Sequence, residues 1–386
     1  MFNRTIDMST ILRSVLFVLV LGTGIVSQAQ SGERIFQGFL HSMDNLAAGA
    51  EDSHSAEEAQ EEKGADPLHH VKDAHDVHLC GEGHDAFSIP LPVILWTDNG
   101  LVMFMSSEFH HDDTGHHIVE KNGMQFVKSH EKIYQLNAGA HGVEFDHHHH
   151  PTNATKPLDI SITKNVFAMF AVAIILILVF RAVGKRYKAD EVAPAPTGIA
   201  GWMEPIVLFV RDFSIENIGK DKYMKFMPYL LTVFFFIWFG NLFGLIPFLG
   251  GVNMTGSISV TLTLAAFTLI IQLINSKGPF WKHIFMPPGV PVALYPILVP
   301  IELVGVLVKP AALTIRLFAN ITAGHIIILS LIGIIFTYAN VAWAGLSVPM
   351  ALFISTLELL VAFLQAYIFT MLSAMFIGAA VDDGHH

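Results

Sequence analysis

The apolar residues of this chain gather in long runs in its second half, whereas the first half alternates short apolar runs with polar segments. A helix needs about 20 mostly apolar residues to cross a bilayer. Stretches near or beyond that length cover residues 166–183, 226–248, 258–274, 294–338 and 348–381. The pattern predicts a helical membrane domain over residues 165–386, with about five membrane helices.

Three of the helical segments depart from a simple upright span. Residues 199–218 place apolar side chains at helical spacing with charged residues between them, which predicts an amphipathic helix on the membrane surface. Residues 294–338 and 348–381 are too long for upright spans, so we expect strong tilt or lateral packing against a partner. Helices that bend or extend into water are the alternative. The predicted fold class is an all-α polytopic membrane protein with a small β-containing N-terminal domain.

That N-terminal domain is expected at residues 87–140, where short β-favouring runs alternate with turns. Asp98-Asn99-Gly100 and Asn122-Gly123 are good hairpin turn signals, so we predict a small antiparallel sheet outside the membrane. Residues 30–86 are rich in Ala, acidic residues and His, which predicts a flexible segment with little core. Residues 141–164 are expected to be a linker to the first membrane helix.

Residues 1–29 have the features of a secretory signal peptide. An apolar core at residues 15–26 precedes Ser27-Gln28-Ala29, which has the small-x-small form of a cleavage site. An uncleaved anchor helix is the alternative, and in both cases the following residues leave the cytoplasm. Beyond the first apolar run, eight of the twelve basic residues after residue 164 lie between Arg181 and Lys225, as expected of a cytoplasmic loop. We therefore expect a bacterial inner-membrane protein with a periplasmic N-terminal domain and a cytoplasmic C-terminus.

Composition and charge agree with this division. The chain is 52% hydrophobic and 14% charged, with a mean hydropathy of +0.51, which is too apolar for a soluble protein. Residues 30–164 hold 22 acidic against 8 basic residues, and residues 165–386 hold 10 against 12, within a net charge of −11. The single cysteine, Cys80, excludes an internal disulfide and a Cys-based zinc cluster. No basic patch for nucleic acid is present.

Ionisable residues interrupt the last two apolar runs, at Glu302, Lys309, Arg316, His325 and Glu358. A charge near the bilayer midplane costs about 3 kcal/mol on insertion scales, so such groups usually face protein or water and mark an ion path. Arg316 stays charged at any biological pH, and therefore blocks protons and attracts a carboxylate. The long side chain of Lys309 can place its ammonium group at the membrane interface, so a structural role is the alternative to a place in the ion path.

The segments around these residues, KPAALTIRLFANITAGH and LELLVAFLQAYIFTMLSAMFIGAA, resemble subunit a of the F-type ATP synthase, the stator subunit of the membrane proton channel. The motif residues are Arg316 within R-L-F-x-N-x-x-A-G, Glu302 fourteen residues earlier, Lys309-Pro310, and Gln365 in L-Q-A-x-I-F. Weaker agreement extends the resemblance from about Asp159 to Ala380. Residues 30–140 stay unexplained by it.

The resemblance implies that Arg316 is the essential arginine facing the rotating ring of c subunits. It also implies that Asn320 and Gln365 line the same interface and that Glu302 belongs to the proton path. Two aqueous half-channels would then carry protons to and from a carboxylate on the ring. The implied partners are the c ring, the b subunits of the peripheral stalk and the lipid bilayer, with no cofactor. The sequence has no G-x-x-x-x-G-K-[ST] loop, so a nucleotide site of its own is not expected.

His325 and Glu358 stand where many bacterial members of that family have Glu and His, respectively. The exchange suggests that the two residues form one titratable pair across two helices, and that the histidine and the glutamate can occupy either of the two positions. Histidine beside a carboxylate titrates in the physiological range, which suits a proton relay. A pair that only orients the two helices is the alternative.

Seventeen of the 21 histidines lie between His41 and His150. His147, His148, His149 and His150 are the candidate metal ligands, because imidazole binds Zn, Cu and Ni. A solvated, pH-sensitive surface is the alternative, since no fixed ligand spacing appears. These histidines keep a second function class open, a metal-responsive membrane sensor or uptake protein, although no signalling motif follows. A third class, a stand-alone secondary transporter, is disfavoured because the spans show no internal repeat.

Overall fold

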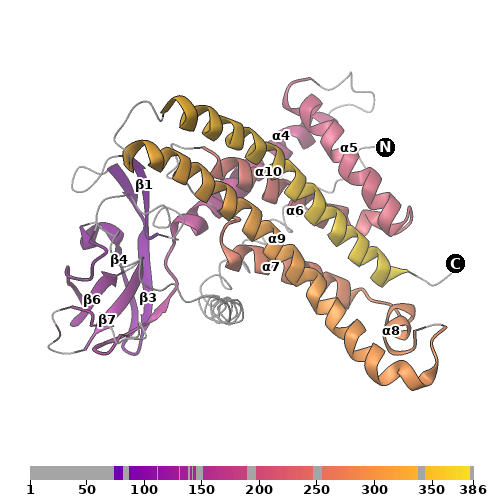
Figure 1. Ribbon diagram of the computed structural model, residues 1–386, viewed down its shortest axis with the longest axis horizontal. Helices are drawn as coiled ribbons and strands as arrows, with labels where there is room; N and C mark the ends of the chain where they lie inside the picture. Colours follow the sequence, from indigo (N-terminus) through magenta and orange to yellow (C-terminus); the bar gives the residue numbers. More distant parts are fainter. Residues whose placement is uncertain are drawn as a thin grey trace.

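The computed structural model describes residues 74–80, 87–110, 112–129, 131–137, 140, 142–144, 151–188, 197–246, 254–287, 289–337 and 344–382. The predicted signal peptide at residues 1–29 and most of the segment at residues 30–86 therefore lie outside the described residues. The described part has a β-rich N-terminal unit followed by a helical region (Figure 1).

The N-terminal unit is built from three small antiparallel sheets, ordered β1-β2, β4-β3-β9 and β5-β6-β7-β8. Its elements are β1 (Asp76–Cys80), β2 (Phe87–Pro90), β3 (Pro92–Thr97), β4 (Gly100–Met105), η3 (Ser106–Phe109), β5 (Val119–Lys121), β6 (Met124–Ser129), β7 (Lys132–Leu136), β8 (Ala154–Thr155) and β9 (Leu158–Asp159). Strands thus occur on both sides of the expected range of 87–140. β1 pairs with the neighbouring β2, whereas the two-residue strands β8 and β9 pair with β7 and β3. Directly before β1, the His75 Nε2 atom lies 2.9 Å from Asp159 Oδ2 in β9.

Both predicted hairpin turns are confirmed. Asn122 and Gly123 join β5 to β6 with φ angles of 52° and 73°, and two successive positive φ angles define the hairpin turn that Asn-Gly favours. Thr97 pairs with Gly100 across the turn between β3 and β4, and the Thr97 hydroxyl donates to the Gly100 carbonyl at 2.8 Å.

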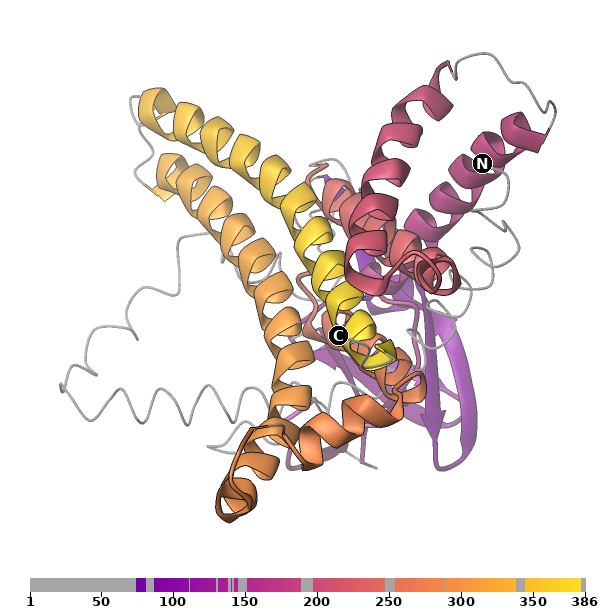
Figure 2. The ribbon, with the colours of Figure 1, turned by 90° about the vertical axis from the view of Figure 1, so that its right-hand side faces the viewer.

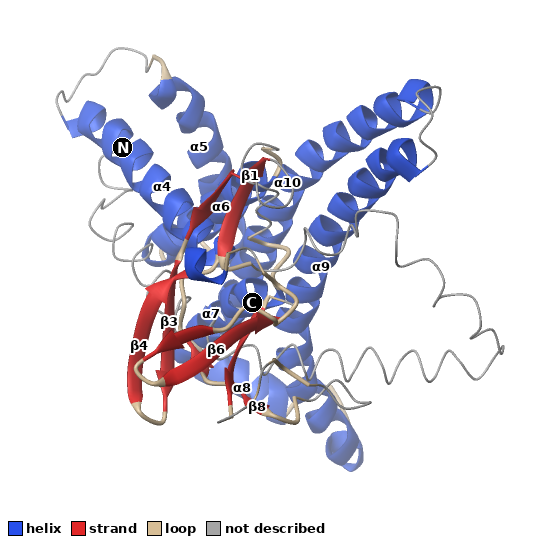
Figure 3. Ribbon diagram, turned by 90° about the vertical axis from the view of Figure 1, so that its left-hand side faces the viewer, coloured by secondary structure: helices blue, strands red, loops and turns tan. Residues whose placement is uncertain are grey.

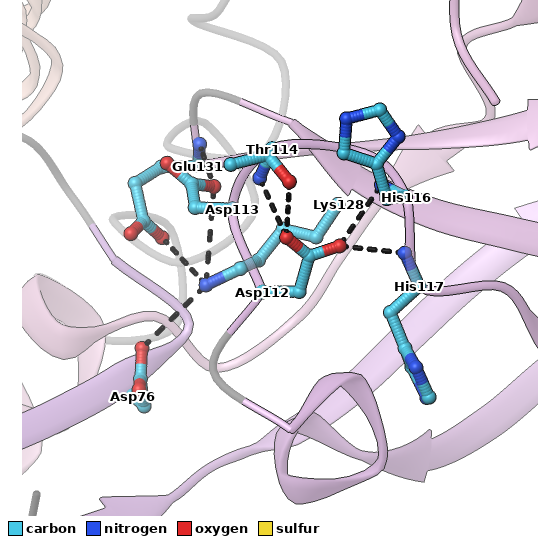
Figure 4. A network of polar contacts seen from close by, with 8 residues as sticks. All are labelled: Asp76, Asp112, Asp113, Thr114, His116, His117, Lys128 and Glu131. Atoms are coloured by element: carbon cyan, nitrogen blue, oxygen red, sulfur yellow. Dashed lines mark hydrogen bonds and ion pairs between the residues drawn. The ribbon is translucent and has the colours of Figure 1, made fainter. Parts of the chain in front are cut away.

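A polar cluster around the buried Lys128 lies at the turn between β6 and β7, beside β1 (Figure 4). Lys128 is buried, and its Nζ lies 3.6 Å from Glu131, 3.9 Å from Asp113 and 4.0 Å from Asp76. Burial raises the pKa of Glu131 above its ordinary value, with Lys128 opposing the shift and the neighbouring Asp113 and Asp76 reinforcing it. Lys128 therefore offsets the charge of the buried Glu131 and of the partly buried Asp76 and Asp113 beside it.

Asp112 organises the loop beside this cluster. Its carboxylate accepts hydrogen bonds from the Thr114 amide and hydroxyl and from the His116 and His117 amides. Partial burial alone would raise the pKa of Asp112, but these donors stabilise the ionised form and lower the pKa to about 2. The carboxylate is thus charged at neutral pH and fixes the loop between η3 and β5.

The helical region contains α4 (Lys164–Lys188), α5 (Ile199–Ile218), α6 (Tyr223–Gly244), α7 (Ile258–Ile274), α8 (Gly278–Phe285), η5 (Val292–Leu294), α9 (Tyr295–Thr337) and α10 (Ala344–Val381). Among the described helices, α4, α6, α9 and α10 are long and apolar enough to span a membrane, and α7 with α8, bent by 102°, adds a fifth if the pair is one span. The chain is a multi-pass membrane protein. Helix α5 forms over the predicted residues and is not among the candidate spans.

Helix α6 is the centre of the helical region. Its middle is buried on all sides, with Phe234, Phe235 and Phe236 among the largest fully buried side chains. It packs against α4, α5 and α10. The continuous apolar run of α6, without a polar face, is the pattern of a helix surrounded by other helices.

The pair α9 and α10 lies side by side and diverges from α4 and α5, so that the two pairs form a V (Figures 2 and 3). Helix α9 continues through Pro300 and Pro310 for 43 residues, and α10 has 38. At 1.5 Å per residue these helices are about 65 and 57 Å long, against a hydrocarbon core of about 30 Å. Neither helix fits upright in a bilayer, as their apolar length in the sequence indicates.

The end of α10 is attached to two loops that carry basic residues. The Lys222 ammonium donates to the Val381 carbonyl at 2.8 Å, and the Lys277 amide donates to the Ala380 carbonyl at 2.9 Å. Cations and amide donors satisfy carbonyls that a helix leaves unpaired at its C-terminus. The position of α10 is thereby fixed relative to α6 and α7.

Candidate functional site

The predicted site residues lie on α9 and α10, which form an antiparallel pair. Three contacts define the register: the Ser347 hydroxyl donates to the Leu331 carbonyl, the Glu358 carboxyl lies against Gly324, and Lys309 Nζ lies 5.8 Å from the centre of the Phe376 ring. Later residues of α10 meet earlier residues of α9. This register decides which of the predicted residues can act together.

Helix α9 has two different faces around Arg316. Leu313, Leu317 and Ile321 recur every four residues and are buried. Arg316 and Asn320, one turn apart, are exposed on another side of the helix. The neighbouring exposed positions include Ala312, Ala319 and Ala323. The guanidinium group therefore stands on a surface of small side chains that the described part of the chain leaves uncovered.

Gln365 lies opposite this region on α10. Interpolation between the Glu358–Gly324 and Lys309–Phe376 contacts places Arg316 and Gln365 at nearly the same height along the helix pair, within about 5 Å. Gln365 is only 3% exposed, so it belongs to the helix interface and not to the outer surface of Arg316. The structure thus brings the arginine and the glutamine to one height but on different surfaces.

Glu358 is buried, at 7% exposure, and packs against the backbone of α9. A Cβ atom at Gly324 would overlap the Glu358 carboxyl group, so only glycine fits at that position without a shift. Gly324 directly precedes His325, whose side chain lies outside the described residues. The backbone contact therefore places Glu358 beside the segment that carries the predicted partner.

Sequence reasoning missed two groups of polar contacts inside the helical region. In the first, the Thr255 hydroxyl donates to Asn241 Oδ1, and Asn241 Nδ2 donates to the Ala362 carbonyl at 3.4 Å, one turn from Glu358. In the second, the Tyr229 and Thr268 hydroxyls lie 2.8 Å apart, and Thr268 lies 3.2 Å from Ser373. The only signal in the sequence was single polar residues within apolar runs. Their hydrogen-bond partners lie on other helices or loops, so the sequence alone does not identify these contacts.

Glu302 and Lys309 precede Arg316 at intervals of seven residues, which places all three on one side of α9. Glu302 is half-buried and Lys309 is exposed. The Lys309 ammonium lies over the Phe376 ring, a cation–π contact that links α9 to α10. This contact supports a structural role for Lys309 rather than a role in the ion path. Glu302 lies about 21 Å from Arg316 along the axis of α9.

The candidate metal ligands His147 to His150 lie outside the described residues. Within the residues that the structure does describe, no group of three or more His, Cys, Asp or Glu side chains is arranged to hold a metal ion. The rings of His110 and His117 meet edge to face with centres 4.8 Å apart. Two imidazoles alone do not make a built metal site.

Comparison with known proteins divides the chain as the structure does. The family model described as ATP synthase A chain matches residues 166–378, and one described as a domain of unknown function (DUF8433) matches residues 67–160. ATP synthase subunit a of Chloroherpeton thalassium is 45% identical over 267 residues, covering 66% of this chain and 79% of that protein. The protein of the same name from Chlorobium phaeobacteroides (strain BS1) is 46% identical over 276 residues, covering 70% and 76%. That of Myxococcus xanthus is 45% identical over 235 residues, covering 59% and 76%.

Proposed function

Because the chain belongs to the family of ATP synthase subunit a, we propose that Arg316 is the fixed charge separating two proton half-channels where the chain meets a rotating c ring. Family membership itself makes the chain a proton-channel stator subunit that works with the rest of the ATP synthase. It also decides against the two other classes, a metal-responsive sensor and a stand-alone secondary transporter. The finer assignments below are proposals for individual residues.

The observation that carries the proposal is the surface around Arg316. Arg316 and Asn320 point away from the buried side of α9, among exposed alanines. Small side chains allow a neighbouring membrane helix to approach closely. An arginine facing lipid would be costly, so a partner that supplies a carboxylate fits this surface better than lipid does. The ring of c subunits is that partner.

The arginine would act through its charge and not through covalent chemistry. A guanidinium does not lose its proton in proteins, so protons cannot pass through it from one half-channel to the other. A ring carboxylate arriving beside it is favoured in the ionised form and releases its proton. A membrane potential supplies about 2.3 kcal/mol per charge per 100 mV, so several protons must cross for each ATP. Whether H⁺ or Na⁺ is carried is decided by the surroundings of the ring carboxylate.

One half-channel is proposed to lead past the first group of buried polar contacts. Thr255 lies in the loop just before α7 and Asn241 near the end of α6, where the connecting loop would face the periplasm. Asn241 contacts the backbone of α10 one turn from Glu358. A proton entering at this end could therefore reach Glu358 and its predicted partner His325, and then the ring.

The other half-channel is proposed to open toward the cytoplasm along the first part of α9. Glu302 lies on the same side of α9 as Arg316 and nearer its N-terminus, which the topology places inside. Gln365 would hold the α9–α10 interface together at the height of the arginine. In this topology the β-rich unit is periplasmic, the C-terminus is cytoplasmic and the membrane is a bacterial inner membrane. The b subunits of the peripheral stalk would hold the chain against the turning ring.

Cross-linking tests the proposed surface directly. In a Cys80→Ser background, Ala319→Cys is expected to form a cross-link with a cysteine placed beside the c-ring carboxylate. Leu178→Cys, at an exposed position on α4, is the matched control and should not react. A cross-link at Leu178, or none at Ala319 in an assembled complex, would contradict the proposed ring interface.

A further inference from the structure

The sheet of β4, β3 and β9 is apolar on both faces. Val93, Leu95, Val102 and Phe104 point inward and form the core with residues of the second large sheet. The opposite side, which we call the outer apolar face, is formed by Trp96, Leu101, Met103, Met105, Leu158 and Ile160. All of these side chains are at least 40% exposed, and Met103 reaches 60%.

Cross-strand pairing shows that these residues form one surface. Trp96 pairs with Leu101 on one side and with Leu158 on the other. Met103 and Met105 follow Leu101 at every second position of β4, so they lie on the same face. An antiparallel sheet with one solvated face normally carries polar residues there. A continuous apolar surface outside the core marks a site of interaction instead.

Only a short segment of chain connects the outer apolar face to the first membrane helix. The Ile160 amide donates to the Ile94 carbonyl at 2.9 Å, and the Ile162 amide donates to the Pro92 carbonyl at 3.2 Å, so the pairing with β3 continues past β9. Helix α4 begins at Lys164, whose amide donates to the Ala74 carbonyl at 2.8 Å. At the rise of an extended chain, Ile160 is within about 14 Å of the first residue of α4.

Helix α4 also carries exposed apolar side chains near its start. Phe167, Phe170 and Ile174 are exposed on the first turns of this span. In Figure 1, β3 lies nearer the helices than β6 and β7 do. Because the inner face of the β3–β4 sheet packs against the β6–β7 sheet, the outer apolar face lies on the side away from that sheet. The nearest apolar medium available to that face is the bilayer into which α4 inserts.

We propose that the outer apolar face rests in the interfacial region of the bilayer, so that the β-rich unit lies on the membrane surface beside α4. Trp96 is well suited to this position, because tryptophan is enriched at the boundary between lipid and water. The six side chains that form the face are uncharged, which distinguishes it from a surface attracted electrostatically to headgroups. Lipid contact through Trp96, Leu101, Met103 and Leu158 holds the unit at a fixed height and orientation relative to the helices.

Spin labelling of the complete complex in lipid vesicles tests this placement. Labels are attached at Met103→Cys, on the outer apolar face, and at Glu120→Cys, an exposed position on β5 in the other sheet, both in a Cys80→Ser background. Collision rates with oxygen, which concentrates in lipid, and with a water-soluble nickel chelate are then compared. The proposal expects the ratio of oxygen to nickel collisions at Met103 to exceed that at Glu120.

Two outcomes would overturn the proposal. Equal ratios at Met103 and Glu120 would mean that water covers the outer apolar face. Low collision rates with both reagents at Met103 would mean that another protein covers it. ATP-driven proton pumping by the labelled complex serves as the assembly control. The inference depends on the membrane helices and not on the role of Arg316, so the two proposals can fail separately.

Discussion

The carboxyl group of Glu358 occupies the space that a side chain at Gly324 would need, and this contact joins α10 to α9 beside His325. The missing side chain at Gly324 therefore leaves room for the Glu358 carboxyl group. Because interiors are closely packed, a residue with a Cβ at this position must displace the carboxyl group.

Gly324→Ala is expected to lower ATP-driven proton pumping while the complex still assembles, because the Glu358 side chain must shift away from α9. Gly333→Ala is the matched control on the same helix: no described atom lies within 4 Å of a Cβ built at Gly333. Fluorescence quenching in inverted vesicles measures the pumping. Equal activity in the two variants would show that the contact is unimportant for proton transfer.

The proposed pair of His325 and Glu358 predicts compensation between the two positions. Glu358→His alone should lower proton flux on the order of 100-fold, the typical contribution of a positioned proton-transfer group. Adding His325→Glu restores one carboxylate and one imidazole, so flux should recover in part. A double variant no more active than the single one would favour a pair that only orients the helices.

The Asn241–Thr255 contact predicts a defect in passive proton conduction. In Asn241→Leu the buried Thr255 hydroxyl loses the amide it bonds to, which costs about 1–3 kcal/mol, and the proposed outer half-channel loses a polar group. Conduction should fall in vesicles stripped of the soluble ATPase sector. Tyr229→Phe removes a hydroxyl from the second polar group, outside the proposed path, and should leave conduction near normal. Similar losses in both would indicate a general effect on packing.

Lys128→Met should destabilise the β-rich unit by about 3–5 kcal/mol, because removing one partner of a buried charge cluster leaves the carboxyl groups of Asp76, Asp113 and Glu131 without this cation. Lys121→Met breaks an exposed pair with Glu108 and should cost less than about 1 kcal/mol. Hydrogen exchange of β6 and β7 in the complete protein measures the difference. Equal protection in the two variants would contradict the assigned role of Lys128.

The sequence predicted most of the helical region because long apolar runs leave few choices. The predicted helical segments 258–274 and 199–218 are observed as α7 and α5 with the same bounds. Helix α8 was missed because its eight residues are fewer than the window of about 11–18 residues over which helical periodicity is recognised. The two-residue strand β9 was missed because it pairs with β3, which lies far from it in the chain. Strand β1 was missed although it pairs with the neighbouring β2.

Individual site residues could be predicted, but their arrangement could not. Arg316, Gln365 and Glu358 were identified from motifs and from the cost of charge in lipid. The contact of Glu358 with Gly324 and that of Asn241 with Thr255 depend on how helices pair, which a single sequence does not contain. The exposure of Arg316 beside alanines likewise became visible only once the buried side of α9 was known.

The most direct test of the central claim is proton movement in membrane vesicles carrying Arg316→Ala, with the soluble ATPase sector first removed and then restored. Lys309→Ala, which removes an exposed cation seven residues earlier on the same helix, is the matched control. We predict that Arg316→Ala abolishes ATP-driven pumping in an assembled complex, whereas Lys309→Ala retains most of it. Pumping that survives without Arg316 would show that this residue is not the barrier between the two half-channels.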